Sequence, residues 1–199
     1  MPKGIQKGMK LIRAPEDLVA RLSEASNREG KPFLEYITEA FEQALRAHEM
    51  NRSVKEIVDF YELMMMQKDA GMVVTPSETL NGLIQRLYRS DKEFLQKLWF
   101  DSGRWYGKYL LAKVGDGDPV ELFVEVLKVT GWNLKDAEFK RNDDSIVFRC
   151  ISFTLSMENT VLLMKFVEGV MTTLGYEVTN RDCMRGMINL NFGPVKSKS

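Results

Sequence analysis

The feature that most constrains the fold of this 199-residue chain is a change in the spacing of its apolar residues near Gly131. Up to that glycine, apolar residues recur every three or four positions, as in the stretch from Val120 to Leu127, and this spacing predicts helices. After it, apolar and polar residues alternate, which predicts β-strands with one buried face. A chain with this order must place a sheet after a series of helices.

The segment after Gly131 predicts two hairpins separated by a helix. The expected elements are strands at 134–140 and 145–153 around a turn at 142–144, a helix from Ser156 to Leu174, and strands at 176–180 and 186–192 around a turn at 181–183. In the last strand Met187, Asn189 and Asn191 share one face, opposite the apolar face. We therefore predict an α+β fold that ends in a ββαββ sheet domain.

The N-terminal segment has a different organisation. Residues 1–14 carry four basic side chains, Lys3, Lys7, Lys10 and Arg13, and no acid. A short strand at 9–14 is followed by a helix that begins at Pro15 and ends near Gly30, and a second helix runs from Pro32 to about Glu49. A unit of about 50 residues with one exposed strand buries too little surface to be stable alone, so we expect it to pair with a second copy.

This N-terminal pattern resembles the ribbon-helix-helix family of DNA-binding regulators over residues 7–48. The matching features are the strand at 10–14, the Arg13-Ala14-Pro15-Glu16 junction, the Leu18/Leu22 stripe, Gly30, and Ile37, Ala40 and Phe41 in the second helix. The resemblance implies that two chains form a homodimer whose paired strands enter the major groove of double-stranded DNA.

Strand alternation indicates which side chains face the groove. If Ile12 and Ala14 pack on the helices, then Met9, Leu11 and Arg13 point outward, and of these only Arg13 reads a base edge well. Lys31 supplies a charge at the start of the second helix, although the hydroxyl residue usual in the family is missing there. The expected DNA-binding residues are Lys7, Met9, Lys10, Leu11, Arg13 and Lys31. The alternative is a domain that only dimerises.

A long helix, capped by Asp91 and reaching about Lys113, holds the densest aromatic cluster. Its two glycines, four residues apart, each cost ~1 kcal/mol relative to alanine inside a helix, so they need a packing reason. One interpretation is a close helix crossing, and the other is one wall of an apolar pocket. The ligand-binding residues under the second interpretation are Trp99, Phe100, Gly103, Trp105, Tyr106 and Gly107.

Residues 91–193 resemble the vinyl-reductase-type small-ligand domain and its relatives, the haem-NO-binding-like and TRAPP-subunit-like folds. The matching residues are Gly103, Gly107, Val120 to Gly131, Glu168-Gly169, Leu174-Gly175-Tyr176, Cys183 and Gly186. The resemblance implies a module that binds an apolar small molecule or a protein. Metal-binding members of the family use more cysteines than Cys183 alone, so we expect neither a metal nor a cofactor here.

Composition excludes several functional classes. Basic and acidic residues number 28 each, and the chain holds one histidine and two cysteines, which disfavours histidine-based catalysis, metal sites and disulfide frameworks. Glu158, Glu168 and Asp182 are accompanied by no nucleophile or phosphate loop, so we do not expect an enzyme. No stretch approaches the ~18 apolar residues of a membrane span. We expect a cytoplasmic protein without a membrane partner.

Together these patterns predict a ribbon-helix-helix domain at 1–50, a helical connector at 51–75, an α+β domain at 76–195 and a disordered tail at 196–199. The predicted function is a dimeric DNA-binding transcriptional regulator whose C-terminal domain senses a small ligand or sets assembly. The alternative is an adaptor that uses its first domain only for dimerisation and its second domain to bind a partner.

Overall fold

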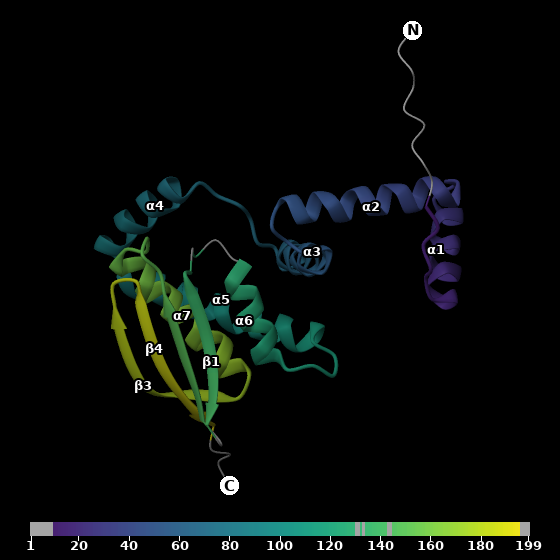
Figure 1. Ribbon diagram of the computed structural model, residues 1–199. Coiled ribbons are helices and arrows are strands. Elements are labelled where there is room, and N and C mark those ends of the chain that lie inside the picture. Colours follow the sequence, from purple (N-terminus) through teal and green to yellow (C-terminus); the bar gives the residue numbers. More distant parts are fainter. Residues whose placement is uncertain (1–9, 130–131, 133, 143–144, 196–199) are drawn as a thin grey trace. The chain divides into compact units, whose positions relative to one another are not determined.

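The computed structural model describes residues 10–129, 132, 134–142 and 145–195, and these residues form seven helices and one four-stranded sheet (Figure 1). The chain divides into two compact units between Asp59 and Phe60. The predicted α+β class is therefore confirmed. The predicted tail at 196–199 and the basic residues Lys3 and Lys7 lie outside the described residues.

The first unit is built on a helix pair whose ends follow the predicted signals. Helix α1 (Glu16–Arg28) begins directly after Pro15, and α2 (Phe33–Glu49) begins directly after Pro32. Between them Gly30 adopts a φ of 68°, a left-handed conformation that glycine reaches without a steric cost. The Lys31 N–H then donates to the Ser26 carbonyl at 3.0 Å, which closes the end of α1.

Helix α3 (Val54–Asp69) crosses the boundary between the two units. It begins with a reciprocal cap, in which the Glu56 N–H donates to Ser53 Oγ and the Ser53 N–H donates to a Glu56 carboxylate oxygen. Its last turns belong to the second unit, because the Tyr109 hydroxyl donates to the Met66 carbonyl at 2.9 Å. Met66 also packs against the core of that unit.

Three further helices precede the sheet: α4 (Ser77–Ser90), α5 (Lys92–Lys113) and α6 (Pro119–Val129). The expected cap of the long helix is present, since the Phe94 N–H donates to Asp91 Oδ1 at 3.0 Å. Helices α5 and α6 lie where the apolar spacing of their residues predicted helices.

The predicted ββαββ order is also observed. It consists of β1 (Asp136–Asn142), β2 (Ser145–Ile151), α7 (Met157–Thr173), β3 (Tyr176–Met184) and β4 (Met187–Pro194). The strands are antiparallel in the order β1-β2-β4-β3. Helices lie against one face of this sheet, with α7 behind the strands in Figure 1. The main core lies between that face and the helices, and its fully buried side chains include Phe123, Phe148, Leu163, Val167, Leu190 and Phe192.

The turn of the second hairpin was wrongly placed by the sequence analysis. Residues 181–183 continue strand β3, and the turn lies at Arg185 and Gly186, where the glycine has a φ of 72°. The pairing of β3 with β4 shifts by one residue between Val178 and Asn180. This bulge interrupts the alternation of apolar and polar residues, so the sequence pattern does not predict that the strand continues beyond the bulge.

Candidate functional site

The helix pair of the N-terminal unit leaves most of its apolar residues exposed. Among residues 10–59, only Ser26 and Ala47 are buried. The large apolar side chains exposed on α1, α2 and the segment before them are Leu11, Ile12, Leu18, Val19, Phe33, Leu34, Phe41 and Leu45. Exposed apolar surface of this extent is typical of a protein–protein interface.

The segment that was predicted to read DNA lies just before α1. Lys10, Leu11 and Arg13 are exposed, and Leu11 is 94% accessible to solvent. Lys7 and Met9, which were predicted to accompany them, lie outside the described residues. Residues 10–15 form neither helix nor strand in the single chain. Because a ribbon strand needs a second chain to pair with, the predicted strand stays a prediction.

Lys31, the expected phosphate contact, forms ion pairs with two carboxylates in this structure. Its ammonium group lies 2.6 Å from Glu39 Oε2 and 3.1 Å from Glu29 Oε2. The hydrogen bonds with Glu39 and then with Glu29 raise the pKa of Lys31. A phosphate would therefore have to compete with two acids for this cation.

The glycine pair of α5 is explained by a close crossing with α7. A Cβ on Gly103 would overlap the carbonyl oxygen of Phe166, and a Cβ on Gly107 would lie 2.8 Å from Cβ of Thr173. From the other helix, a Cβ on Gly169 would overlap the carbonyl oxygen of Phe100. The two backbones touch at these positions, which leaves no room for a ligand between them. The first of the two interpretations, a helix crossing, therefore accounts for the glycines.

The aromatic side chains around these glycines point in different directions. Tyr106 is buried in the core beside Phe123 and Phe166, whereas Trp105 is 53% exposed and stacks on Tyr109 at 5.8 Å between ring centroids. Trp99 and Phe100 are half-buried. Burial raises the pKa of Tyr106, whose hydroxyl has no hydrogen-bond partner within the described part of the chain. Ligand binding by these side chains stays a prediction.

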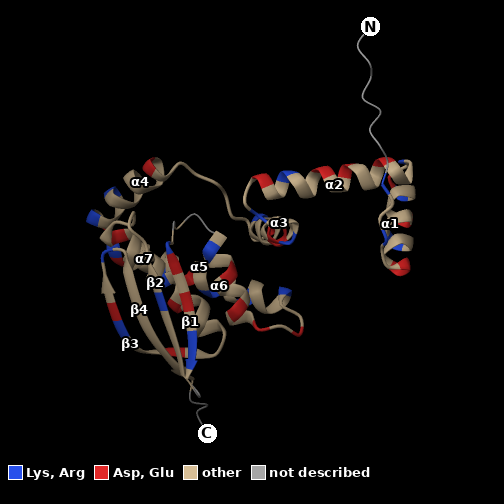
Figure 2. Ribbon diagram, viewed as in Figure 1, with Lys and Arg blue, Asp and Glu red and all other residues tan. Residues whose placement is uncertain are grey.

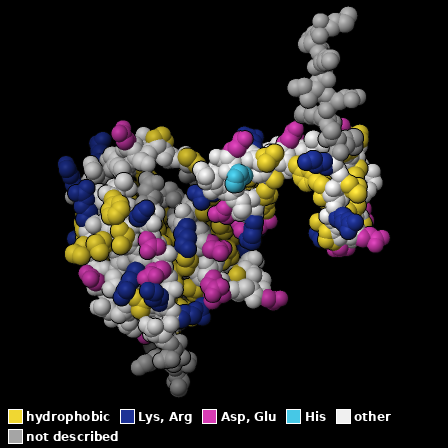
Figure 3. Space-filling model, viewed as in Figure 1, with side chains coloured by type: hydrophobic (Ala, Val, Ile, Leu, Met, Phe, Trp, Pro, Cys, Tyr) yellow, Lys and Arg dark blue, Asp and Glu magenta, His cyan; other side chains and the backbone are white. Residues whose placement is uncertain are grey.

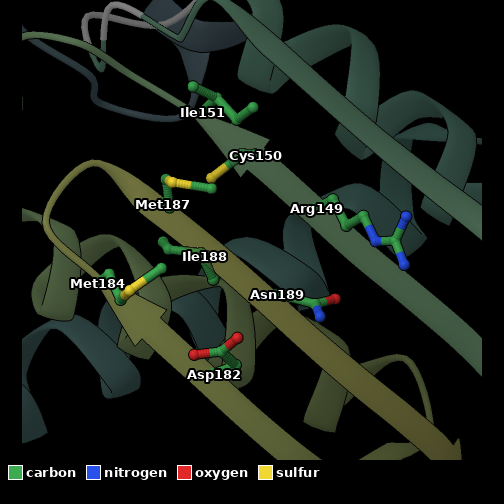
Figure 4. Close-up of a pocket in the computed structure, with 8 residues that line it drawn as sticks. All are labelled: Arg149, Cys150, Ile151, Asp182, Met184, Met187, Ile188 and Asn189. Carbon is green, nitrogen blue, oxygen red and sulfur yellow. The ribbon is translucent and has the colours of Figure 1, made fainter.

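A depression forms elsewhere, on the face of the sheet turned away from the helices (Figure 4). It has a volume of about 200 Å³ and is lined by Arg149, Ile151, Asp182, Met184, Met187 and Asn189, together with Cys150 and Ile188. Figure 4 shows Asn189 on β4 between Arg149 on β2 and Asp182 on β3. Hydrophobic and charged side chains lie next to each other on the sheet in Figure 3.

This face was not among the predicted sites, although one signal for it is present in the sequence. The alternation of β4 separates Met187, Asn189 and Asn191 from the buried residues. The contribution of β3 could not be found in the same way, because the turn was placed at 181–183 and Asp182 was therefore not assigned to a strand.

On the buried side of the sheet, Glu168 of α7 forms a network of two ion pairs. The side chain is 3% exposed, and its carboxylate accepts hydrogen bonds from Lys165 Nζ at 2.7 Å and Arg181 Nε at 2.5 Å. The β3 bulge makes this possible, because after it Arg181 lies opposite the buried Leu190 and faces α7. Glu168 therefore connects α7 to β3, an arrangement typical of a structural ion pair rather than of an exposed general base.

The two cysteines flank Ile188 in neighbouring strands, with Cys150 paired to it from β2 and Cys183 from β3. Both are free thiols, and burial raises the pKa of Cys150 to about 12. Within the described ranges, no three histidine, cysteine, aspartate or glutamate side chains are grouped as metal ligands. No helix of those ranges is both long and apolar enough to cross a membrane.

Comparisons with known proteins give little further information. No protein-family model matches the chain, and no curated protein matches its sequence. A solved structure described as "Probing the function of heme distortion in the H-NOX family" is similar over 73% of this chain and 94% of that chain, with 15% sequence identity and a TM-score of 0.38. A likeness at this score is too weak to support a conclusion about ligand or function.

Proposed function

We propose that the protein is a dimeric DNA-binding regulator. Two N-terminal units would pair as a ribbon-helix-helix domain, and the C-terminal α+β domain would sense a small ligand or set assembly. The observation that carries this proposal is the apolar surface of α1 and α2, which the single chain leaves in water. Burial of apolar surface contributes roughly 25 cal/mol per Å², so this helix pair gains most of its stability only when a partner covers it.

Arg13 is the proposed base-reading residue. Its side chain is exposed directly before α1, and an arginine forms two parallel hydrogen bonds with guanine in the major groove. Lys10 would contact the phosphate backbone, together with Lys7 outside the described residues. Leu11 offers only apolar contact, for example with a thymine methyl group.

A second candidate function is an adaptor that dimerises without binding DNA. It is favoured by the ion pairs that Lys31 forms with Glu29 and Glu39. These pairs engage the ammonium group that was expected to contact a phosphate. In this case the same apolar surface would still pair two chains. The two candidates therefore differ in DNA binding rather than in dimerisation.

Fluorescence anisotropy of the full chain with duplex DNA at two salt concentrations separates these candidates. A DNA-binding protein loses affinity steeply as salt rises, because phosphate contacts release counterions. For a selected operator, Arg13→Ala should weaken binding by ~1 to 3 kcal/mol per half-site and relax sequence preference. The matched control is Arg46→Ala, an exposed arginine near the end of α2. If the wild-type chain does not bind duplex DNA at low salt, the adaptor is the correct candidate.

Dimerisation through the N-terminal strands has its own test. Ile12→Pro removes a backbone donor that the paired ribbon would need, so it should abolish DNA binding and weaken self-association of the full chain. An Ile12→Val variant keeps the donor and the β-branched side chain, and should behave like the wild type. Unchanged DNA binding by the proline variant would contradict a ribbon-helix-helix dimer.

A further inference from the structure

The face of the sheet that lies opposite the core carries two well-defined rows of side chains on β2, β4 and β3. We call it the outer sheet face. The strand register places Ile151, Met187 and Met184 side by side in an apolar row, and Arg149, Asn189 and Asp182 side by side in a polar row. All three apolar side chains are exposed. Both rows belong to the depression in Figure 4.

The polar row has unused interaction capacity. Oδ1 of Asn189 is inaccessible to water and has no hydrogen-bond partner among the described residues, which is unfavourable for a buried carbonyl oxygen. Arg149 and Asp182 form no ion pair with any residue that the structure describes. Within one chain they are two strands apart, about 10 Å at the usual strand spacing, so they do not neutralise each other directly.

These rows are self-complementary about a two-fold axis that runs along β4 between two facing sheets. Such an axis exchanges β2 and β3 and places β4 opposite its own copy. Arg149 then faces Asp182 of the second copy, and Asn189 faces Asn189. Once its side-chain amide rotates so that Oδ1 leaves its buried position, the two amides can hydrogen-bond to each other. In the next row Ile151 faces Met184, and Met187 faces Met187. Apolar side chains meet apolar ones, and opposite charges meet.

Strand β1 supports the same arrangement by its composition. Because β1 lies beyond β2 in the strand order, the two-fold axis leaves it without a facing strand. The residues that β1 presents on this face are Asp136, Glu138, Lys140 and Asn142, all polar and three of them charged. Figure 2 shows acidic and basic stretches along β1. The apolar row is thus confined to the three strands that would be covered, and the strand that would stay in water is polar.

From this match we infer that the outer sheet face binds the same face of a second copy of this chain, forming a sheet-on-sheet dimer of the C-terminal domain. Facing sheets of this kind pack about 10 Å apart with their side chains interdigitated. This contact does not depend on DNA binding. If the N-terminal units also pair, the tether raises the effective concentration of the two sheets, and even a modest interface would then form.

Site-specific cross-linking of the full chain tests the axis directly. Asn189→Cys places a thiol on the axis, opposite its own copy, whereas Lys140→Cys places one on the same sheet face but away from the axis. With Cys183→Ala in both variants, a short bis-maleimide should link Asn189→Cys into a covalent dimer at least five times as efficiently as Lys140→Cys. Equal yields would refute the two-fold arrangement, because tethering by the N-terminal units alone would raise both yields alike.

Charge exchange gives an independent test in the Asn189→Cys background. Arg149→Glu and Asp182→Lys should each lower the cross-linking yield severalfold, because like charges then face each other twice across the dimer. The double variant should restore the yield. Tryptophan fluorescence during urea unfolding checks that each variant is folded. If the double variant fails to restore cross-linking, or if an apolar dye saturates the depression without competing with cross-linking, the face is a ligand site and the dimer is wrong. The Ile12→Pro experiment is unaffected by either result.

Discussion

Replacing Gly103 by alanine is the sharpest test of how the C-terminal domain is packed. The new methyl group would overlap the carbonyl oxygen of Phe166, a backbone atom that cannot rotate away. Helices α5 and α7 would have to separate by on the order of 1 Å to restore normal contact. Overpacking of this kind costs typically ~1 to 3 kcal/mol, and the better helix propensity of alanine returns at most about 1 kcal/mol. Because the obstacle is backbone, we expect a net loss of about 2 kcal/mol.

Urea unfolding followed by tryptophan fluorescence measures this loss in the right domain. All three tryptophans, Trp99, Trp105 and Trp132, lie in the C-terminal unit. With an m value of roughly 2 kcal/mol per M, Gly103→Ala should lower the urea midpoint by about 1 M.

Gly82→Ala is the matched control, because a Cβ at Gly82 in α4 meets nothing within 4 Å. The same substitution there should raise stability by ~0.5 to 1 kcal/mol. If Gly103→Ala leaves the midpoint unchanged, or if both variants shift it in the same direction, the close contact of α5 and α7 is not what requires the glycine.

Two further predictions concern buried titratable groups. Glu168→Gln should lower the free energy of unfolding by ~1 to 3 kcal/mol in the same urea assay, because it removes the buried negative charge that is hydrogen-bonded to Lys165 and Arg181. The control Asp101→Asn breaks only the exposed ion pair with Lys97 and should lower it by less than ~1 kcal/mol. Equal losses in the two variants would contradict a structural role for Glu168. The Cys150 thiol, whose pKa burial raises to about 12, should resist a thiol reagent at pH 8 in the folded protein and react after unfolding. Since the folded state holds this proton more tightly than the unfolded state, Cys150 should add no pH dependence to the stability below the unfolded pKa of about 9, and a fall of at most ~1.4 kcal/mol per pH unit between 9 and 12. Burial raises the pKa values of Cys183 and Tyr106 as well, so these groups add to the alkaline fall. A Cys150→Val variant should show a shallower fall of stability between pH 9 and 12 than the wild type, and an unchanged slope would assign the effect to other groups.

The local elements could be predicted from the sequence, because the signals that start and end them are short-range. Proline at the first turn, aspartate or serine at the cap and glycine after the last turn depend only on backbone geometry within a few residues. Pro15, Pro32, Asp91 and Ser156 therefore mark the starts of α1, α2, α5 and α7 as expected. The alternation after Gly131 likewise predicted the ββαββ order.

The contacts between those elements could not be predicted in the same way, because they join residues far apart in the chain. The glycines of α5 indicated a close approach, but the approaching group, the backbone of α7, comes from residues more than 60 positions later. Because of the bulge in β3, the turn of the second hairpin lies later than predicted and Arg181 faces Glu168. No local sequence pattern predicts a shift of one residue in strand pairing. The outer sheet face joins residues of three strands whose pairing follows from the register. Contacts between distant segments depend on how the whole core packs, and a single sequence records that packing only indirectly.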